Sequence, residues 1–427
     1  MKILIKNVDI ITCDDSEKVI KDAFVTIKNG YIEYIGKNQK EDFKPDRIID
    51  GKNKVLMPGL INAHTHCGMT ILRNYANDLK LEDWLFNNIL PTEEKLSPED
   101  IYWGTLLGIT EMIKTGTTTF LDMYLHMNQV AKAVCDAGIR ANLSKNPLDF
   151  DENGKITKED YSFFKKWHNA ENGRIKTSFE VHSVYLFNEE SLTQSAKCAK
   201  ELGTRINIHI LETERERKDS LKMYKMSPVE IALKTGILDV PVTAAHCIHL
   251  SQNDFDIIKE KGVDVVHNPS SNLKLGSGIA KVPELLKSEV NVSLGTDGAA
   301  SNNNLNMMEE MHLAALIHKG VKMDPTCVKA YDVLKMSTVN GSKALDFEKE
   351  TGLIKQGMKA DVILIDMDKP HICPVNDPVS AVVYSAQGSD VDTVIIDGNI
   401  VMEKGELKTI DEERVKFQVN KTAKRII

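Results

Sequence analysis

The feature that most constrains the fold of this 427-residue chain is a repeated unit, in which a short apolar run ends in a polar residue and a helical pattern follows. The strand-like runs end at His66 and at Asp122, and lie at Arg140–Ser144, Ile175–His182, Ile206–His209, Val242–His246, Val263–His267 and Val290–Asp297. Eight strands that alternate with helices over roughly 300 residues are typical of a (β/α)8 barrel. The sequence therefore predicts an α/β barrel of this type for residues 56–354.

The helices between these runs have recognisable ends. Ser97-Pro98-Glu99-Asp100 predicts a helix start, with serine as the N-cap and proline at the first helical position. The apolar periodicity continues to Lys114, and Gly116 supplies a stop. The same order of cap, helix and glycine recurs at 188–203, 227–236 and 251–262.

The two ends of the chain have a different pattern, which favours strands. Residues 1–55 alternate apolar and polar side chains, with Asn29-Gly30 as a hairpin turn. Residues 355–427 contain similar runs at 361–365, 381–384 and 393–396. Neither end is long enough for a comfortable domain, so we expect both to join in one small β-sandwich beside the barrel. The last ~15 residues are charged and predict a surface helix or tail.

Composition excludes several classes of partner. The net charge is −8 and the pI about 5.9, which argues against nucleic acid and anionic membranes. No apolar run approaches the ~18 residues that span a bilayer, and no signal-peptide pattern opens the sequence. The seven cysteines include no Cys-x-x-Cys pair, which indicates free thiols in a reducing cytoplasm.

Four metal-competent residues lie at the predicted ends of three separate strands. His64 and His66 are two apart, so their side chains point the same way. His209 and Asp297 end two further runs, and strand ends meet at the C-terminal face of a barrel. Three nitrogens and a carboxylate leave room for a metal-bound water with a pKa of ~7. The alternative is that each histidine only satisfies a hydrogen bond, and the complete set favours the metal.

Other polar residues near these strand ends are candidates for proton transfer. Glu212 follows His209 by three residues and can reach over the metal, although an acidic and basic run around it also fits a solvated glutamate. His246 could polarise the water or a developing oxyanion. His249 fits the surface or an outer layer of the site, and His267 ends a strand without a clear role.

Several long motifs resemble one enzyme family. The chain is similar to the amidohydrolase superfamily and, more narrowly, to the 5-methylthioadenosine/S-adenosylhomocysteine deaminases. The resemblance covers nearly the whole chain, as far as Gly357–Asp361. It is carried by His64-Thr65-His66, 68–73, 81–86, His209 with Glu212, Ala245-His246-Cys247, 267–276 and 296–303.

The resemblance implies a hydrolytic deamination at one divalent metal, expected to be zinc, held by His64, His66, His209 and Asp297. It implies that Asp297 and His246 activate the water that attacks C6 of adenine. Glu212 would protonate N1 and assist departure of ammonia. No lysine is clearly placed to bridge two metals, and the Pro-Cys-x-x-Cys signature of cytidine deaminases is absent from the sequence.

The resemblance also assigns substrate contacts. Glu93 would accept hydrogen bonds from the ribose hydroxyls, because a carboxylate offers two acceptor oxygens to a diol. His182 would contact the nucleoside from the fourth strand end. Without the family, both would be dismissed, Glu93 as one acid in a charged run and His182 as a capped strand end. Trp84 could line the wall of the pocket, although a position in the hydrophobic core fits it better.

One departure concerns substrate choice. Lys145 and Lys155 stand where arginines of the family would meet the carboxylate of S-adenosylhomocysteine, and lysine lacks the bidentate geometry. Methylthioadenosine, 5′-deoxyadenosine and adenosine remain open as substrates. Two other hypotheses remain. The protein could be an amidohydrolase that acts on another amino- or chloro-substituted ring, such as guanine or a triazine, or a non-catalytic barrel that serves as a scaffold. The combination of Glu93 and His182 favours a small-molecule nucleoside as the partner. The sequence leaves open whether the protein forms a homo-oligomer.

Overall fold

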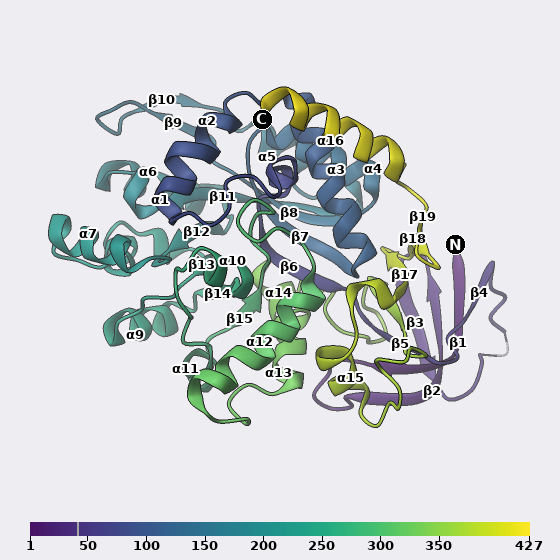
Figure 1. Ribbon diagram of the computed structural model, residues 1–427. Helices are drawn as coiled ribbons and strands as arrows, with labels where there is room; N and C mark the ends of the chain where they lie inside the picture. Colours follow the sequence, from purple (N-terminus) through teal and green to yellow (C-terminus); the bar gives the residue numbers. More distant parts are fainter. Residues whose placement is uncertain (41) are drawn as a thin grey trace.

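The computed structural model describes residues 1–40 and 42–427. Its centre is a barrel of parallel strands that confirms the predicted (β/α)8 fold (Figure 1). The eight strands, in their order in the sheet, are β6 (Leu60–Thr65), β7 (Thr117–Met123), β8 (Arg140–Lys145), β11 (Ile175–Ser183), β12 (Ile206–Ile210), β13 (Val242–His246), β14 (Asp264–His267) and β15 (Val292–Leu294). The largest difference from the predicted strands is at β15, which is shorter at both ends.

The first barrel strand, β6, bonds to the segment that directly follows the last strand, β15. The backbone N–H of Asp297 donates to the carbonyl of His64 at 3.0 Å. Asn62 joins the same two segments, because its Nδ2 donates to Thr296 Oγ1 at 2.7 Å and its Oδ1 accepts from the Thr296 N–H at 3.0 Å. Gly295 permits this approach, since a Cβ there would lie 2.9 Å from the Cβ of His64.

Helices cover the outside of the barrel with the predicted caps. Ser97 and Asp100 form a capping box before α3, and Ser227 and Ser251 begin their helices in the same way. The longer helices are α3 (Pro98–Lys114), α4 (Met127–Ala137), α6 (Glu189–Leu202), α7 (Glu214–Tyr224), α9 (Gln252–Lys261) and α12 (Met307–Lys322). The shorter ones are α5 (Ser162–Trp167), α8 (Pro228–Lys234), α10 (Pro269–Lys274), α11 (Val282–Lys287), α13 (Ala330–Met336) and α14 (Val339–Ala344).

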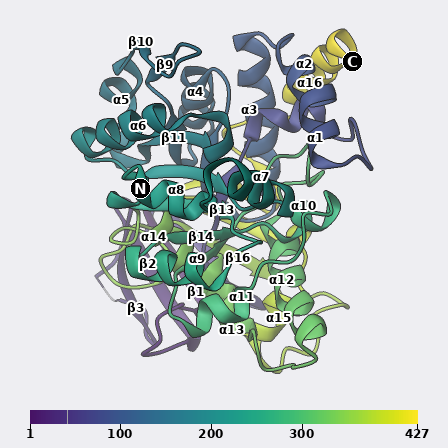
Figure 2. The same cartoon turned by 90° about the vertical axis from the view of Figure 1, so that its left-hand side faces the viewer.

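Short elements surround the C-terminal mouth of the barrel. They are η1 (Cys67–Leu72), α1 (Leu81–Trp84), η2 (Leu85–Ile89), α2 (Leu90–Glu93), β9 (Leu148–Phe150), β10 (Ile156–Glu159) and η4 (Val184–Leu186). Two further short elements, η3 (Glu171–Gly173) and η5 (Ile237–Asp239), precede the N-terminal ends of β11 and β13. Figure 2 looks at the molecule from the side on which α7, α8 and α9 lie in front of the barrel strands, with β1–β3 below them.

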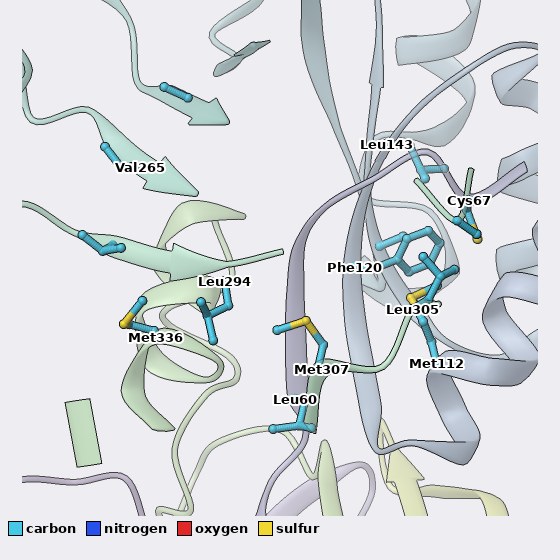
Figure 3. Close-up of a cluster of buried hydrophobic side chains, with 14 of the residues drawn as sticks. Leu60, Cys67, Met112, Phe120, Leu143, Val265, Leu294, Leu305, Met307 and Met336 are labelled. Carbon is cyan, nitrogen blue, oxygen red and sulfur yellow. The ribbon is translucent and has the colours of Figure 1, made fainter. Parts of the chain in front are cut away.

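The core continues from the barrel strands to the helices around them. Figure 3 shows Phe120 of β7 beside Met112 of α3 and Leu305, with Cys67 close by. All four of these side chains are buried. Apolar residues on the outer face of a barrel strand thus hold its helix in place, while the strand ends remain available for polar side chains.

The two ends of the chain pair in one nine-stranded sheet. It contains β1 (Lys2–Ile11), β2 (Val19–Lys28), β3 (Tyr31–Gly36), β4 (Arg47–Asp50), β5 (Lys54–Pro58), β16 (Val362–Asp366), β17 (Val391–Ile396), β18 (Asn399–Glu403) and β19 (Glu406–Leu407). The antiparallel pair β5 and β16 joins the two ends. Alternate residues such as Ile3, Val25 and Leu364 enclose a core of their own, as expected for a small sandwich, whereas Met57 and Ile363 pack in the barrel's core.

The strand predicted at 381–384 is wrong, because this run belongs to the helix α15 (Pro378–Tyr384). Asp377 caps that helix and its carboxylate accepts from the backbone N–H groups of Val379 and Ser380, while Pro378 occupies the first turn. These start signals outweigh the β preference of two consecutive valines. The turn η6 (Gly388–Asp390) then leads into β17.

The charged C-terminal segment is the surface helix α16 (Glu412–Ile426), drawn in yellow alongside α3 in Figure 1. Arg425 and Thr422 both donate to the carboxylate of Asp100, the partner of Ser97 in the capping box of α3. Among the described residues, all seven cysteines are free, and no helix combines the length and hydropathy needed to cross a membrane.

Candidate active site

The four predicted metal ligands meet at the C-terminal mouth of the barrel. His66 Nε2 lies 3.2 Å from His209 Nε2 and 3.3 Å from Asp297 Oδ1, and His64 Nε2 lies 3.5 Å from the same oxygen. A tetrahedron with ~2.0–2.1 Å zinc–nitrogen bonds has edges of roughly 3.3–3.4 Å. These three distances therefore lie at or near the spacing expected for ligands of one small cation. Two groups of donor atoms lie within 4.8 Å of one another, one formed by His64, His66 and His209 and one formed by His64, His246 and Asp297.

The histidines turn their Nε2 atoms toward the space between the four donor groups. His66 Nδ1 bonds to the carbonyl of Met123 at 2.6 Å, and His209 Nδ1 bonds to the carbonyl of His182 at 2.7 Å, which leaves each Nε2 as the lone-pair donor. His64 Nε2 is buried and has no hydrogen-bond partner in the described structure. Burial lowers the pKa of His64 to about 4 and that of His209 well below its usual range, so both are neutral.

Asp297 is aimed by its backbone and by two serines. Its φ of 62° lies in the left-handed region, which is uncommon for a residue other than glycine. Oδ2 accepts from Ser271 Oγ at 2.6 Å and from Ser301 Oγ at 3.0 Å. These bonds occupy Oδ2 and turn Oδ1 toward the histidines.

His246 and Glu212 lie next to the four ligands. His246 Nε2 is 3.8 Å from Glu212 Oε2, and His246 Nδ1 bonds to Asn272 Oδ1 at 2.8 Å. Glu212 is 9% exposed, so it does not fit the alternative of a solvated glutamate. Burial raises its pKa, which favours a carboxyl that can hold a proton. The backbone N–H of Glu212 donates to Glu216 at 2.9 Å, which fixes the turn after β12.

A cavity opens above the ligands and contains the predicted substrate residues. Glu93 and His182 are on its wall, and Tyr124 Oη donates to Glu93 Oε1 at 2.6 Å. Trp84, for which the sequence favours a core position, also lines it. The complete lining is His66, Met69, Leu81, Trp84, Leu85, Leu90, Glu93, Met123, Tyr124, Leu125, Glu180, His182, Tyr185, His209, Glu212, His246, Leu275 and Asp297.

Sequence reasoning missed the residues that hold the others. Ser271, Asn272 and Ser301 lie inside the family motifs, which is the signal that could have found them. Tyr124 follows β7 directly, the same kind of position that identified the histidines. Glu180 lines the cavity from β11, two residues before His182, and alternation along the strand could have found it.

The other residues considered from the sequence lie away from the ligands. Lys145 and Lys155 do not line the cavity: the ammonium of Lys145 lies 5.7 Å from the ring centre of Phe163, and Lys155 is exposed. His249 bonds to the carbonyl of Ser277. His267 is buried and its Nε2 lies 3.2 Å from that of His318.

Comparison with known proteins identifies the family. The model of the amidohydrolase family matches residues 55–401. This chain belongs to the amidohydrolase family. A 5-methylthioadenosine/S-adenosylhomocysteine deaminase of Acetivibrio thermocellus is 68% identical to it, over 100% of both chains. A 5′-deoxyadenosine deaminase of Methanosarcina mazei is 45% identical, over 100% of this chain and 98% of the relative.

Solved structures place this amidohydrolase in the same fold. An adenosine deaminase from Xanthomonas campestris with bound zinc superposes with a TM-score of 0.92, at 30% identity, over 99% of this chain and 98% of the other. A triazine hydrolase superposes equally well, with a TM-score of 0.91 over 99% of both chains, but at 23% identity this likeness concerns the fold alone. The barrel and the added sheet are therefore shared.

Proposed function

We propose that this amidohydrolase is a zinc-dependent hydrolytic deaminase of adenine nucleosides, which releases ammonia and leaves hypoxanthine on the sugar. The observation that carries the proposal is the content of one cavity. Three of the four proposed metal ligands line its floor and His64 lies against them, the buried carboxyl of Glu212 is beside them, and a second buried carboxyl, Glu93, is on its wall. The names of the relatives support the same reaction.

One zinc ion per chain would be held by His64, His66, His209 and Asp297. The fit rests on the spacing of their donor atoms and on the buried, unpartnered Nε2 of His64. A bound zinc would lower the pKa of its water to ~7. The free thiols among the described cysteines support a cytoplasmic enzyme.

The side chains around the metal would divide the proton transfers. Asp297 and His246 take the proton of the attacking water, and His246 is held for this by Asn272. The water oxygen bonds to C6, and the bond from C6 to the exocyclic amine breaks. Glu212 delivers a proton to N1 and then assists the amine to leave as ammonia, which suits a buried carboxyl with a raised pKa.

Glu93 and His182 would bind the nucleoside. The two carboxylate oxygens of Glu93 match the vicinal hydroxyls of ribose, and Tyr124 holds the carboxylate in place. His182 is on the wall above His209, with ring centres 4.7 Å apart, so it faces a substrate that reaches the metal. A free base or a triazine has no diol and would leave the second oxygen of the buried Glu93 carboxylate, Oε2, without a partner.

A substrate panel tests the proposal. We expect adenosine, 5′-deoxyadenosine and methylthioadenosine to be deaminated, as followed by the absorbance change from adenine to hypoxanthine. Glu93→Ala should lower kcat/KM for all three to a similar degree, because they share the diol. Turnover of guanine or a triazine without turnover of any nucleoside would refute the proposal, and equal activity on free adenine would remove the role of Glu93.

A further inference from the structure

We infer that Glu216 is a positioning residue for the reaction: its carboxylate holds the turn after β12 in the shape that directs the Glu212 side chain into the cavity. Glu216 has this role only if Glu212 carries the proton, so the inference rests on the proposed function. Glu216 itself lies outside the described lining of the active-site cavity. It therefore acts on the reaction through another residue rather than by touching the substrate.

Glu216 binds two consecutive backbone groups of the turn. Its Oε1 accepts from the N–H of Leu211 at 3.0 Å, and its Oε2 accepts from the N–H of Glu212 at 2.9 Å. Burial raises the pKa of Glu216 to about 7, so at pH 8 the side chain is a carboxylate with an acceptor oxygen for each N–H. The two oxygens thus fix two peptide units together, which a side chain with a single acceptor cannot do.

The helix α7 fixes Glu216 in turn. Thr213 is the N-cap of this helix, and its Oγ1 accepts from the backbone N–H of Glu216 at 3.1 Å. Glu216 lies in the first helical turn, where the helix dipole favours a negative charge. The carboxylate is therefore held by a regular element, and it connects α7 to the turn that precedes the helix.

The turn needs this support because its backbone is strained at Leu211. This residue has a φ of 52°, in the left-handed region that bulky side chains seldom adopt. Its side chain is fully buried, and its carbonyl accepts from the N–H groups of Ile248 at 3.0 Å and His249 at 3.2 Å. Such a conformation persists where the bonds around it over-determine it. Without Glu216, the bonds on the N–H side of Leu211 are lost.

The position of the Glu212 carboxyl depends on this turn more than on its own contacts. Within the described residues, the carboxyl accepts one hydrogen bond, from Ser277 Oγ at 3.4 Å, and it lies 3.8 Å from His246 Nε2. Both distances are long, so neither contact fixes the carboxyl by itself. A rotation at Leu211 would move Glu212 relative to the substrate, and a misplacement of ~1 Å can cost about 10²-fold in rate.

The test is a double-mutant cycle between Glu216 and Glu212 in the metal-loaded enzyme. Glu216→Gln keeps one acceptor oxygen, and Glu216→Ala removes both. At pH 8, we expect kcat for adenosine to fall by about 10-fold in the first variant and about 100-fold in the second, with KM and metal content near the wild-type values. In the Glu212→Gln background, the same substitutions should change the residual kcat by less than about 2-fold, because the group that they displace no longer carries a proton.

Glu214→Gln is the matched control, since it makes the same change in the same turn of α7. The carboxylate of Glu214 lies 3.3 Å from His249 Nδ1 rather than on the turn after β12, so kcat should stay at the wild-type value. A melting curve for each variant reports whether it is folded. If Glu216→Ala does not fold, Glu216→Gln alone completes the cycle.

The outcomes distinguish this inference from the proposed function. Wild-type kcat in Glu216→Gln and Glu216→Ala would overturn the role of Glu216. Equal falls of kcat with and without the Glu212 carboxyl would overturn it as well, because Glu216 would then act on the fold or through a different residue. A wild-type enzyme that deaminates none of the nucleosides would instead refute the proposed function.

Discussion

At the scale of single residues, the proposed site depends on the second bond that three of its four ligands make. The backbone carbonyls of Met123 and His182 fix the tautomers of two histidines, and two serines fix the carboxylate of Asp297. Such outer bonds pre-organise the donors before any cation binds. Loss of a ligand should thus empty the site rather than rearrange it.

The first prediction concerns these ligands. His64→Ala and His209→Ala should each lose the approximately one equivalent of divalent metal that we expect in the purified wild-type protein, because neighbouring side chains cannot complete the shell. Metal analysis by mass spectrometry measures the content. His249→Ala, outside the set, should keep its metal, and full occupancy in both ligand variants would refute the site.

The second prediction separates proton transfer from metal binding. Glu212→Gln should retain the metal but lose kcat by about 10²–10⁴-fold, since an amide cannot carry a proton. Steady-state kinetics with adenosine measures the loss. Glu214→Gln is the matched control, because its side chain is half-exposed and contacts His249 rather than the ligands. Turnover near the wild-type value would mean that another group carries the proton.

At the scale of elements, the helix α12 organises two segments of the site. Glu310 is fully buried on this helix and accepts from the backbone N–H of Ser270 at 3.1 Å and from Asn302 Nδ2 at 2.7 Å. Those neighbours belong to the segments that carry Ser271 and Ser301, the two serines bonded to Asp297. One buried carboxyl therefore links a helix to the orientation of a proposed metal ligand.

The third prediction follows from the ionisation of that carboxyl. Burial raises the pKa of Glu310 from its ordinary 4.5 to about 7. An acid whose pKa is raised in the folded state makes its full contribution to the free energy of unfolding below pH 4.5. That contribution is lost as the pH rises to about 7. The stability of Glu310→Gln relative to wild type should thus increase from pH 5 to pH 8, by at most roughly 3 kcal/mol.

Denaturant unfolding across this pH range measures the difference. The trend with pH is the readout, because the amide also changes the hydrogen bonds to Ser270 and Asn302 at every pH. Glu309→Gln, exposed at the preceding position of the same helix, should give a flat difference. A flat difference for Glu310→Gln would show that its carboxyl ionises with an ordinary pKa.

At the scale of the whole molecule, the barrel and the sheet share one buried ion pair. Arg140 at the start of β8 donates from Nε to Asp361 Oδ2 at 2.6 Å and from Nη2 to Oδ1 at 3.1 Å. Both side chains are buried, and the backbone N–H of Asp397 donates to the same carboxylate. We propose the division into residues 1–55, 56–354 and 355–427, and we expect the parts to unfold together because this pair crosses their boundary.

The fourth prediction tests this connection. Arg140→Met leaves Asp361 charged and buried, and should cost about 3–5 kcal/mol of unfolding free energy. Denaturant unfolding followed by fluorescence and by circular dichroism measures it. Arg140→Met with Asp361→Leu should recover most of the loss, because no unpaired charge remains. Equal losses in the single and the double variant would show that packing, not charge, dominates at this position.

The sequence by itself determined the order of strands and helices and the identity of the proposed ligands. Periodicity, caps and glycines are local signals, so they predicted all eight barrel strands, and strand alternation paired His64 with His66. The run at 381–384 shows the limit of prediction from local signals. Its valines favour a strand, but the N-cap Asp377 and Pro378 just before it start a helix. Local preference is weak where two patterns fit the same residues.

Only the tertiary structure decided how these residues act together. Burial of Glu212, the serines on Asp297, Tyr124 on Glu93 and the exclusion of Lys145 from the cavity all join segments distant in sequence. No periodicity encodes such contacts, since they depend on which strand ends the barrel brings together.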